Sequence, residues 1–438
     1  MKDARGVSVS GGSKRSLEIY EQALRALNCY RGDAVAIIDQ ALAAEPDFVM
    51  GQVLRAQVLV TMWERSVLPG VEAGVTRLES LLGRMNDRER RQTRALKLWA
   101  AGDWEGHRAE LDRLLAEDPR DLLALQVGHT ADFFHADRDN LRGRVARALP
   151  AWSRDDPGYG FLLGMQAFGL EECGAYGEAE ETGHRAIELE ADDCWAQHAL
   201  AHVLEMQARQ EEGIELMERR KAHWAQEDNG FAFHNWWHTA LYNLDQGRPE
   251  RALEIYDQGI RPQPSEARLM MLDAAALLWR MHLRGLDTGR RWDELADAFG
   301  KGDENGFYAF NDMHAMMSFV GAGRAAAAAG LLKSVESAAA ERGTNGRMAR
   351  EAGLPIVRAI EAFGRERYAE AVDLLMPVRY GARILGGSHA QRDVVHRTLL
   401  EAALRSGDKP LAQALASERV SLKPHCLFSR ELRARAMQ

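Results

Sequence analysis

The chain has 438 residues, of which 46% are hydrophobic and 28% charged, a composition typical of a globular protein rather than a disordered one. Its net charge of −9, from 56 basic and 65 acidic residues, argues against a nucleic-acid-binding protein or one that binds an anionic membrane, because both need a basic surface. The four cysteines form no CxxC pair, which indicates a reducing compartment. The first residues lack the apolar core of a secretory signal, and no run of about 18 apolar residues could span a membrane, so we expect a cytoplasmic protein.

The chain begins with a Gly- and Ser-containing segment, MKDARGVSVSGGSK, which we expect to be a flexible N-terminal tail over residues 1–14. A repeating pattern follows it, in which a glycine precedes an aromatic or small residue, an apolar helical stretch and an acidic end. The glycines that mark the pattern are Gly32, Gly102, Gly174, Gly247 and Gly364. Weaker turns fall midway between them, so the underlying period is about 35 residues, the size of one helix–turn–helix unit.

Each period predicts two antiparallel helices, the first ending at the glycine and the second at a proline or an acidic turn. Small residues at the expected helix crossings are Ala34, Ala179, Ala252 and Ala371. The sequence therefore predicts an all-α fold: one domain over residues 15–438, a right-handed α/α superhelix of about ten tetratricopeptide-like units. First helices would line a concave wall and second helices the outer layer. We expect a closely packed helix pair in the alanine-rich residues 322–347, and a capping helix beyond Lys409.

Histidines are distributed unevenly over this pattern. Ten of the 14 lie on the first helices or at their ends: His129, His135, His198, His202, His234, His238, His282, His314, His389 and His396. If first helices line a groove, that groove is rich in imidazole.

The segment from Cys194 to Leu244 concentrates this signal. His198, His202 and Glu205 are spaced i, i+4, i+7, and His234 and His238 repeat the i, i+4 pair on the next first helix, so each set shares one helix face. One interpretation is a divalent metal site made by these five residues. A second is acid–base chemistry, with His198, His202 or His238 as the base and Glu205 as its orienting carboxylate. The third is structural: satisfied histidines at helix contacts, with Trp195, Trp236 and Trp237 in the core.

Two further groups are polar where the pattern is helical. In GGSHAQRDVVHRTLL, Ser388 is a good N-cap, and Arg392 with the first backbone amides could hold a carboxylate or phosphate. Asp393 lies one turn after His389 and could orient its ring, although an ordinary capped helix with a surface charge pair explains the same residues. In FNDMHAMM, Asp312 and His314 are polar on an apolar helix, so we expect them to face the groove.

Several of these segments carry a family resemblance. WAQHALAHVLEMQAR, HNWWHTALYNLDQGRPERALEIYDQGI, LLWRMHLRGLDTGRRWDELA, FNDMHAMM and GGSHAQRDV resemble signature segments of the tetratricopeptide repeat protein 38 family, over about residues 20–405. The resemblance implies an all-helical tetratricopeptide-like superhelix and implies no settled activity. The chain departs from the family at Ala208, where members often have glycine at the helix stop, and in the leading residues of HNWWHTAL.

The leading functional hypothesis is a binding protein that takes a small molecule or a peptide end into a concave pocket lined by histidine and tryptophan. Its expected ligand contacts are Trp195, His234, Trp237, Arg280, Asp312, His314 and Arg392. The alternative is an enzyme, a hydrolase or isomerase of a small metabolite, with catalytic candidates His198, His202, Glu205, His238, His389 and Asp393. The third hypothesis is a scaffold for other proteins. The sequence leaves open the ligand, whether the protein is an enzyme, whether a metal is bound, and the oligomeric state, a homodimer included.

Overall fold

The computed structural model describes residues 1–438, and it is all-α, as the repeat pattern predicts: helices follow one another through short connections and no strand forms. The chain divides into two compact units, which we call unit 1 (residues 1–200 and 226–231) and unit 2 (residues 201–225 and 232–438). The sequence predicted a single domain over 15–438. The division falls inside a helix, so no change of composition marks it in the sequence.

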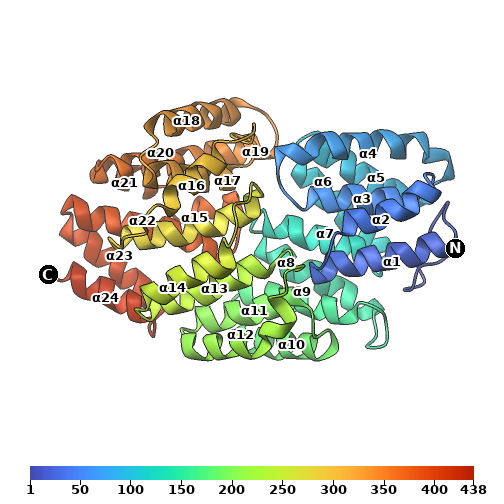
Figure 1. The fold of residues 1–438 in the computed structure, drawn as a ribbon, viewed down its shortest axis with the longest axis horizontal. Helices are drawn as coiled ribbons and strands as arrows, with labels where there is room; N and C mark the ends of the chain where they lie inside the picture. The colour runs from blue at the N-terminus through green and yellow to red at the C-terminus, as the bar shows by residue number, and fades with distance from the viewer. The chain divides into compact units, whose positions relative to one another are not determined.

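Unit 1 contains consecutive helices that pack as antiparallel neighbours (Figure 1). They are α1 (Lys14–Cys29), α2 (Ala34–Ala44), α3 (Val49–Val60), α4 (Leu68–Ser80), α5 (Asp87–Ala100), α6 (Trp104–Glu117), α7 (Leu122–Phe133), α8 (Arg138–Ala148), α9 (Tyr159–Glu172), α10 (Tyr176–Leu189) and the first half of α11 (Cys194–Met206).

Unit 2 continues the same plan from the second half of α11. Its helices are α12 (Gln210–Trp224), α13 (Ala232–Asp245), α14 (Pro249–Ile255), α15 (Arg268–Leu283), α16 (Arg291–Phe299), α17 (Ala309–Gly321), α18 (Ala325–Ala340), α19 (Thr344–Met348), α20 (Leu354–Gly364), α21 (Tyr368–Leu375), α22 (His389–Ser406), α23 (Lys409–Leu422) and α24 (Leu427–Ala436). The alanine-rich segment forms one helix, α18, rather than the expected pair, and two helices rather than one follow residue 408. None of these helices is long and apolar enough to cross a membrane.

The glycines of the pattern end helices as predicted at four of five places. Gly32, Gly102, Gly174 and Gly247 all have φ between 70° and 81°, the left-handed conformation that glycine adopts without strain. Gly364 is the exception: it closes α20 in ordinary helical geometry, and a Cβ there would lie 2.2 Å from Val320. This glycine is therefore needed for a close helix contact, not for a turn.

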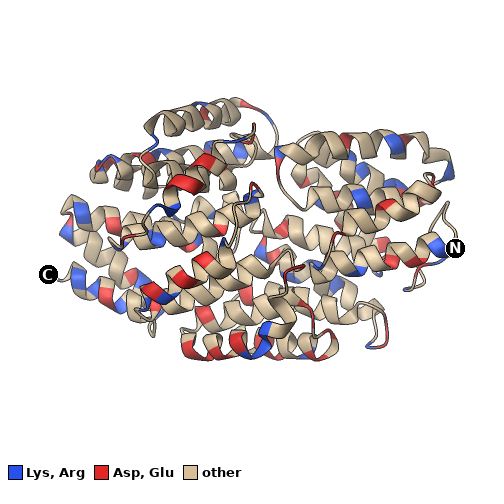
Figure 2. Cartoon of the chain, in the orientation of Figure 1, with Lys and Arg blue, Asp and Glu red and all other residues tan.

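Small residues sit at the helix crossings. The four alanines predicted there are all buried, with exposed fractions from 0% to 8%. Glycines serve the same purpose where backbones approach more closely still: a Cβ at Gly169 in α9 would lie 2.6 Å from the backbone of Arg142 in α8. The acidic residues include several glutamates on second helices such as α10 and α12 (Figure 2).

The first twelve residues form a folded turn rather than the expected flexible tail. The Asp3 carboxylate accepts hydrogen bonds from the backbone amides of Arg5 and Val7. The Arg5 guanidinium is 3% exposed and pairs with both Asp3 and Glu21 of α1. A buried, doubly paired arginine fixes this segment against the first helix, because a buried charge needs its partners.

In unit 2 the first helices pack against one another. Helix α15 contacts α13, α17 and α22. The indole of Trp279 in α15 donates to the Thr398 hydroxyl of α22 at 2.9 Å, and Arg280 donates to the Ala390 carbonyl at 2.5 Å. The expected open concave wall is therefore a packed interior in this unit, and polar groups on its first helices must find partners there.

Candidate functional site

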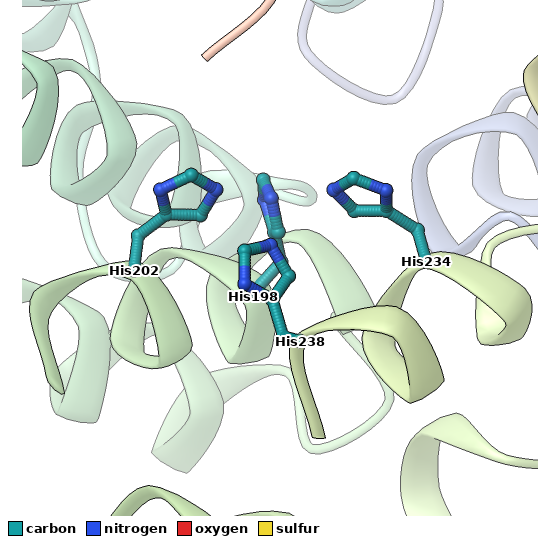
Figure 3. Close-up of side chains that lie close together, drawn as sticks. All are labelled: His198, His202, His234 and His238. Carbon is teal, nitrogen blue, oxygen red and sulfur yellow. The ribbon is translucent and has the colours of Figure 1, made fainter. Parts of the chain in front are cut away.

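Three histidines from two helices of unit 2 meet in this interior. His202 on α11 and His238 on α13 have ring centroids 4.4 Å apart, and His234 lies one turn before His238 with its ring 5.0 Å away. One ring nitrogen from each of the three lies within 4.8 Å of the others. Figure 3 draws these side chains together with His198, which precedes His202 by one turn of α11. We call His202, His234 and His238 the imidazole cluster.

Two carboxylates hold two of the rings. The Nδ1 atom of His238 lies 3.0 Å from Glu205 Oε2, and that of His234 lies 2.6 Å from Asp273 Oδ2. A neutral imidazole has one N–H and one lone pair, so an Nδ1–H donated to a carboxylate leaves the lone pair on Nε2. Both rings are thereby set in the same tautomer.

The sequence pointed to one of these carboxylates and not the other. Glu205 was expected to orient a histidine, and it lies beside His238. Asp273 on α15 was missed, although an aspartate inside RLMMLDAAALLWRMHL is a signal, because a carboxylate on an apolar helix needs a partner. It is 1% exposed.

The surroundings of the cluster favour the neutral forms of His202 and His238 and the ionised form of Glu205. Burial, followed by the nearby His238, lowers the pKa of His202 well below its ordinary value. Burial also lowers the pKa of His238, against the opposing effect of Glu205. Burial alone would raise the pKa of Glu205, but the hydrogen bond from His238 and the charge of Lys423 outweigh it and lower the pKa. At neutral pH His202 and His238 therefore offer imidazole lone pairs rather than imidazolium N–H groups.

A lysine joins this site to a surface pocket. Lys423, at the end of α23, places its Nζ atom 3.8 Å from Glu205 Oε1, and its side chain is 13% exposed. The same lysine lines an open pocket of about 400 Å³ between the end of α11 and the α23–α24 connection. Its other lining residues are Met206, Gln207, Ala208, Arg209, Pro424 and His425. We call this the Lys423 pocket.

Ala208 shapes one side of that pocket. It has φ 58°, the left-handed conformation that a glycine would adopt more easily, and its amide bonds to the Glu205 carbonyl. The helix stop thus has its expected geometry despite the alanine. The cost of this conformation for a non-glycine residue is about 1 kcal/mol.

Other expected ligand contacts of unit 2 are held by the protein itself. Trp237 is fully buried, and the Arg280 guanidinium lies 5.2 Å from its ring and also donates to the Ala276 carbonyl. His314 bonds through Nδ1 to the Phe310 carbonyl, and burial lowers its pKa to about 4. Asp312 accepts from the Gly306 amide. These contacts give the polar residues on apolar helices partners within the protein, and their expected roles in ligand binding stay predictions.

The group at the start of α22 differs in part from the expectation. Ser388 caps the helix as predicted, in a capping box with Gln391. Asp393 does not orient His389: its carboxylate oxygens accept hydrogen bonds from Arg397 and Arg419, because bidentate and charge-assisted bonds to two guanidiniums hold it there. Arg392 donates to the Gly387 carbonyl and lies 3.3 Å from His389 Nδ1.

Those arginines belong to a larger charge network. Arg397 also pairs with Asp245 of α13, which in turn pairs with Arg284, the residue that follows α15. The guanidinium carbons of Arg284, Arg397 and Arg419 lie 3.6 Å, 4.7 Å and 5.9 Å from the centre of the Phe428 ring in α24. We call this the arginine–Phe428 cluster, and its cations and carboxylates stabilise the packing of α13, α15, α22 and α23.

Two candidates lie in unit 1. Trp195 donates from its indole nitrogen to His129 Nε2 at 3.1 Å and is 6% exposed. His198 is buried and stacks on Phe168 with ring centroids 5.1 Å apart. Both are thus part of an aromatic core in that unit, and their expected roles in binding and catalysis stay predictions.

No family model matches the chain, so membership of the tetratricopeptide repeat protein 38 family stays a prediction. Among solved structures, the chain is similar to one in the crystal structure of the APC/C hetero-tetramer Cut9–Hcn1 (12% identity, 98% of this chain and 77% of that chain, TM-score 0.41). It is also similar to the human IFIT1 dimer with PPP-AAAA (11% identity, 96% and 94%, TM-score 0.43) and to yeast Tom70 (14% identity, 96% and 86%, TM-score 0.32).

Proposed function

We propose that this helical-repeat protein binds a small molecule or peptide end that carries an anionic group, a carboxylate or a phosphate, in the Lys423 pocket of unit 2. The observation that carries the proposal is the position of Lys423. Its ammonium lines an open pocket and lies 3.8 Å from Glu205, so an anion bound there would share this lysine with the carboxylate that holds His238.

The chemistry of the lining supports an anionic ligand. Three of its seven residues can carry positive charge (Arg209, Lys423 and His425), and none is a carboxylate, in a chain whose net charge is −9. Arg209 pairs closely with Glu212, at 2.7 Å, whereas Lys423 lies 3.8 Å from Glu205, so we take Lys423 as the main recognition group. Its partial burial strengthens the attraction, because a shielded charge is less screened by water and salt.

The test is a titration of the full chain with inorganic phosphate and, separately, with succinate, by isothermal calorimetry. Lys423→Met keeps the length of the side chain and removes its charge. We expect it to weaken binding about 10- to 100-fold, the effect of losing a charge-assisted hydrogen bond of about 1.5–3 kcal/mol. Lys333→Met, on the exposed face of α18, is the matched control and should change nothing. Equal affinities for the two variants, or no binding of either anion, would refute the proposal.

A second candidate function is an enzyme that uses the imidazole cluster for proton transfer. The two histidine–carboxylate pairs favour it, because a carboxylate on Nδ1 orients an imidazole base and stabilises its protonated form. His238 would be the base and Glu205 its orienting group. A scaffold for other proteins has less support, because the first helices of unit 2 bury the side chains that a partner would need to reach.

A further inference from the structure

We propose that His202, His234 and His238 bind one divalent transition metal ion, with Zn²⁺ as the representative, and that Glu205 and Asp273 position two of the three ligands. This site is separate from the Lys423 pocket, and it does not depend on the pocket binding an anion. All five residues belong to unit 2.

The ligand type decides the class of ion. Three imidazole nitrogens suit Zn²⁺, Co²⁺, Ni²⁺ and Cu²⁺, whereas Mg²⁺ and Ca²⁺ prefer sets of oxygen ligands. The carboxylates of Glu205 and Asp273 are already bonded to ring nitrogens. They are therefore placed as partners of the ligands rather than as ligands.

The separation of the nitrogens suits one ion. Ligand nitrogens about 2.0–2.1 Å from a tetrahedral zinc lie about 3.3 Å from one another. One nitrogen from each of the three rings lies within 4.8 Å of the other two, so these three atoms need to approach by about 1.5 Å at most. Small rotations about the side-chain torsions of three residues on two adjacent helices supply a change of that size.

The hydrogen bonds point the lone pairs in the manner that metal sites require. A metal-bound histidine almost always donates its other N–H to a carboxylate, a carbonyl or water, which fixes the tautomer and makes the ring a better donor. His234 and His238 both have such a carboxylate, at 2.6 Å and 3.0 Å. In this arrangement an ion would bind through the Nε2 atom of each ring.

The charges agree with a cation at the centre. The carboxyl groups of Glu205 and Asp273 bond to two of the rings, and Lys423 Nζ lies 3.8 Å from Glu205. Two carboxyl groups against one lysine favour a cation over an anion between the rings. Three protein ligands also leave one coordination position for water or for an atom of a ligand, the arrangement found in catalytic rather than structural zinc sites.

The first experiment measures metal in the protein as purified without an affinity tag, by elemental analysis. We expect close to one equivalent of Zn²⁺ or another transition metal per chain. The chain stripped with chelator should rebind one Zn²⁺, and Co²⁺ in its place should give the visible spectrum of tetrahedral coordination. Less than about 0.1 equivalent together with no saturable rebinding would overturn the proposal, because a genuine site should be close to full.

Variants assign the site to these residues. His238→Ala should weaken Zn²⁺ binding more than about 100-fold, since loss of a ligand exceeds the 10- to 100-fold effect of losing its carboxylate partner. Asp273→Asn keeps the shape of the side chain and should lie in that smaller range, so it remains informative if the alanine variant fails to fold. His184→Ala, exposed on α10, is the control. Affinities equal to that control would overturn the assignment.

The pocket variant separates the two proposals. Lys423→Met should keep its metal while it loses phosphate binding. The chelator-stripped chain should still bind phosphate, because side-chain cations and not the metal hold it in the first proposal. A metal site without phosphate binding, or the reverse, therefore refutes one proposal and leaves the other standing.

Discussion

Replacing Asp132 in α7 would measure how much a buried ion pair contributes to the stability of unit 1. Its oxygens lie 2.7 Å and 3.0 Å from the Nε and Nη2 atoms of Arg144 and 2.7 Å from Arg108 Nε. The side chains of Asp132 and Arg144 are both fully buried. Burial alone would raise the pKa of Asp132, but the two arginines outweigh it and lower the pKa to about 2 from its ordinary 3.8.

This pKa sets the size of the effect. A difference of about 1.8 units, at about 1.36 kcal/mol per unit, gives about 2 kcal/mol of stability that depends on the ionised carboxylate. The folded pKa is the lower one, so this contribution is complete above about pH 4 and is lost as the pH falls through about 2. Asp132→Asn keeps the shape and removes the charge at every pH. It also leaves Arg144 buried without its main partner, so we expect a loss of about 2–4 kcal/mol at pH 7.

The assay is urea unfolding at pH 7 followed by circular dichroism. Asp112→Asn is the matched control, because Asp112 lies 3.0 Å from Arg144 Nη1 but its side chain is 33% exposed. A partly solvated pair of this kind contributes less than about 1 kcal/mol. If both variants lost the same small amount, the reasoning from burial would be wrong.

Three further predictions concern acid stability, helix packing and the imidazole cluster. Burial lowers the pKa of four histidines to about 3 or 4: His107, His129, His135 and His314. Below about pH 6.5 the unfolded chain therefore binds protons that the folded chain does not, and each histidine should lower the free energy of unfolding by about 2 kcal/mol at pH 5. An equal urea midpoint at pH 5 and pH 7 would refute this prediction. Gly169→Ala should lower the free energy of unfolding by about 1–3 kcal/mol, because the added Cβ would meet the backbone of α8. Gly177→Ala, whose Cβ would have no atom within 4 Å, should raise it by about 0.5–1 kcal/mol. Urea titrations that rank the two variants the other way would contradict the crossing geometry. Glu205→Gln should weaken Zn²⁺ binding about 10- to 100-fold in a chelator competition, whereas the exposed Glu218→Gln should have no effect.

The fold was largely predictable because its signals are local. Helix stops depend on one residue each, and the glycines at 32, 102, 174 and 247 mark them through backbone conformation alone. The prediction of a left-handed helix stop at Gly364 was wrong for the same reason. This glycine allows a close contact with Val320, more than forty residues earlier, and no local sequence pattern indicates such a contact. The folded N-terminal turn was missed likewise, since it depends on Arg5 reaching Glu21.

The candidate site divides in the same way. The histidines and Glu205 could be placed on shared helix faces from their spacing. Asp273 and Lys423 could not be joined to them, because α15 and α23 come from later repeats and only the packing of unit 2 brings them near. The expected pair of His389 and Asp393 failed because i, i+4 spacing says which residues can meet, not which of several cations a carboxylate prefers.

The arginine–Phe428 cluster gives the last helix a protective role. Three guanidiniums share one aromatic ring, and α24 is the element that covers them. A truncation before Leu427 would expose to water an ion network in which Asp245 and Asp393 pair with these three arginines. Such a fragment would lose the dry surroundings that strengthen these ion pairs, so we expect its urea midpoint to fall more steeply with added salt than that of the full chain.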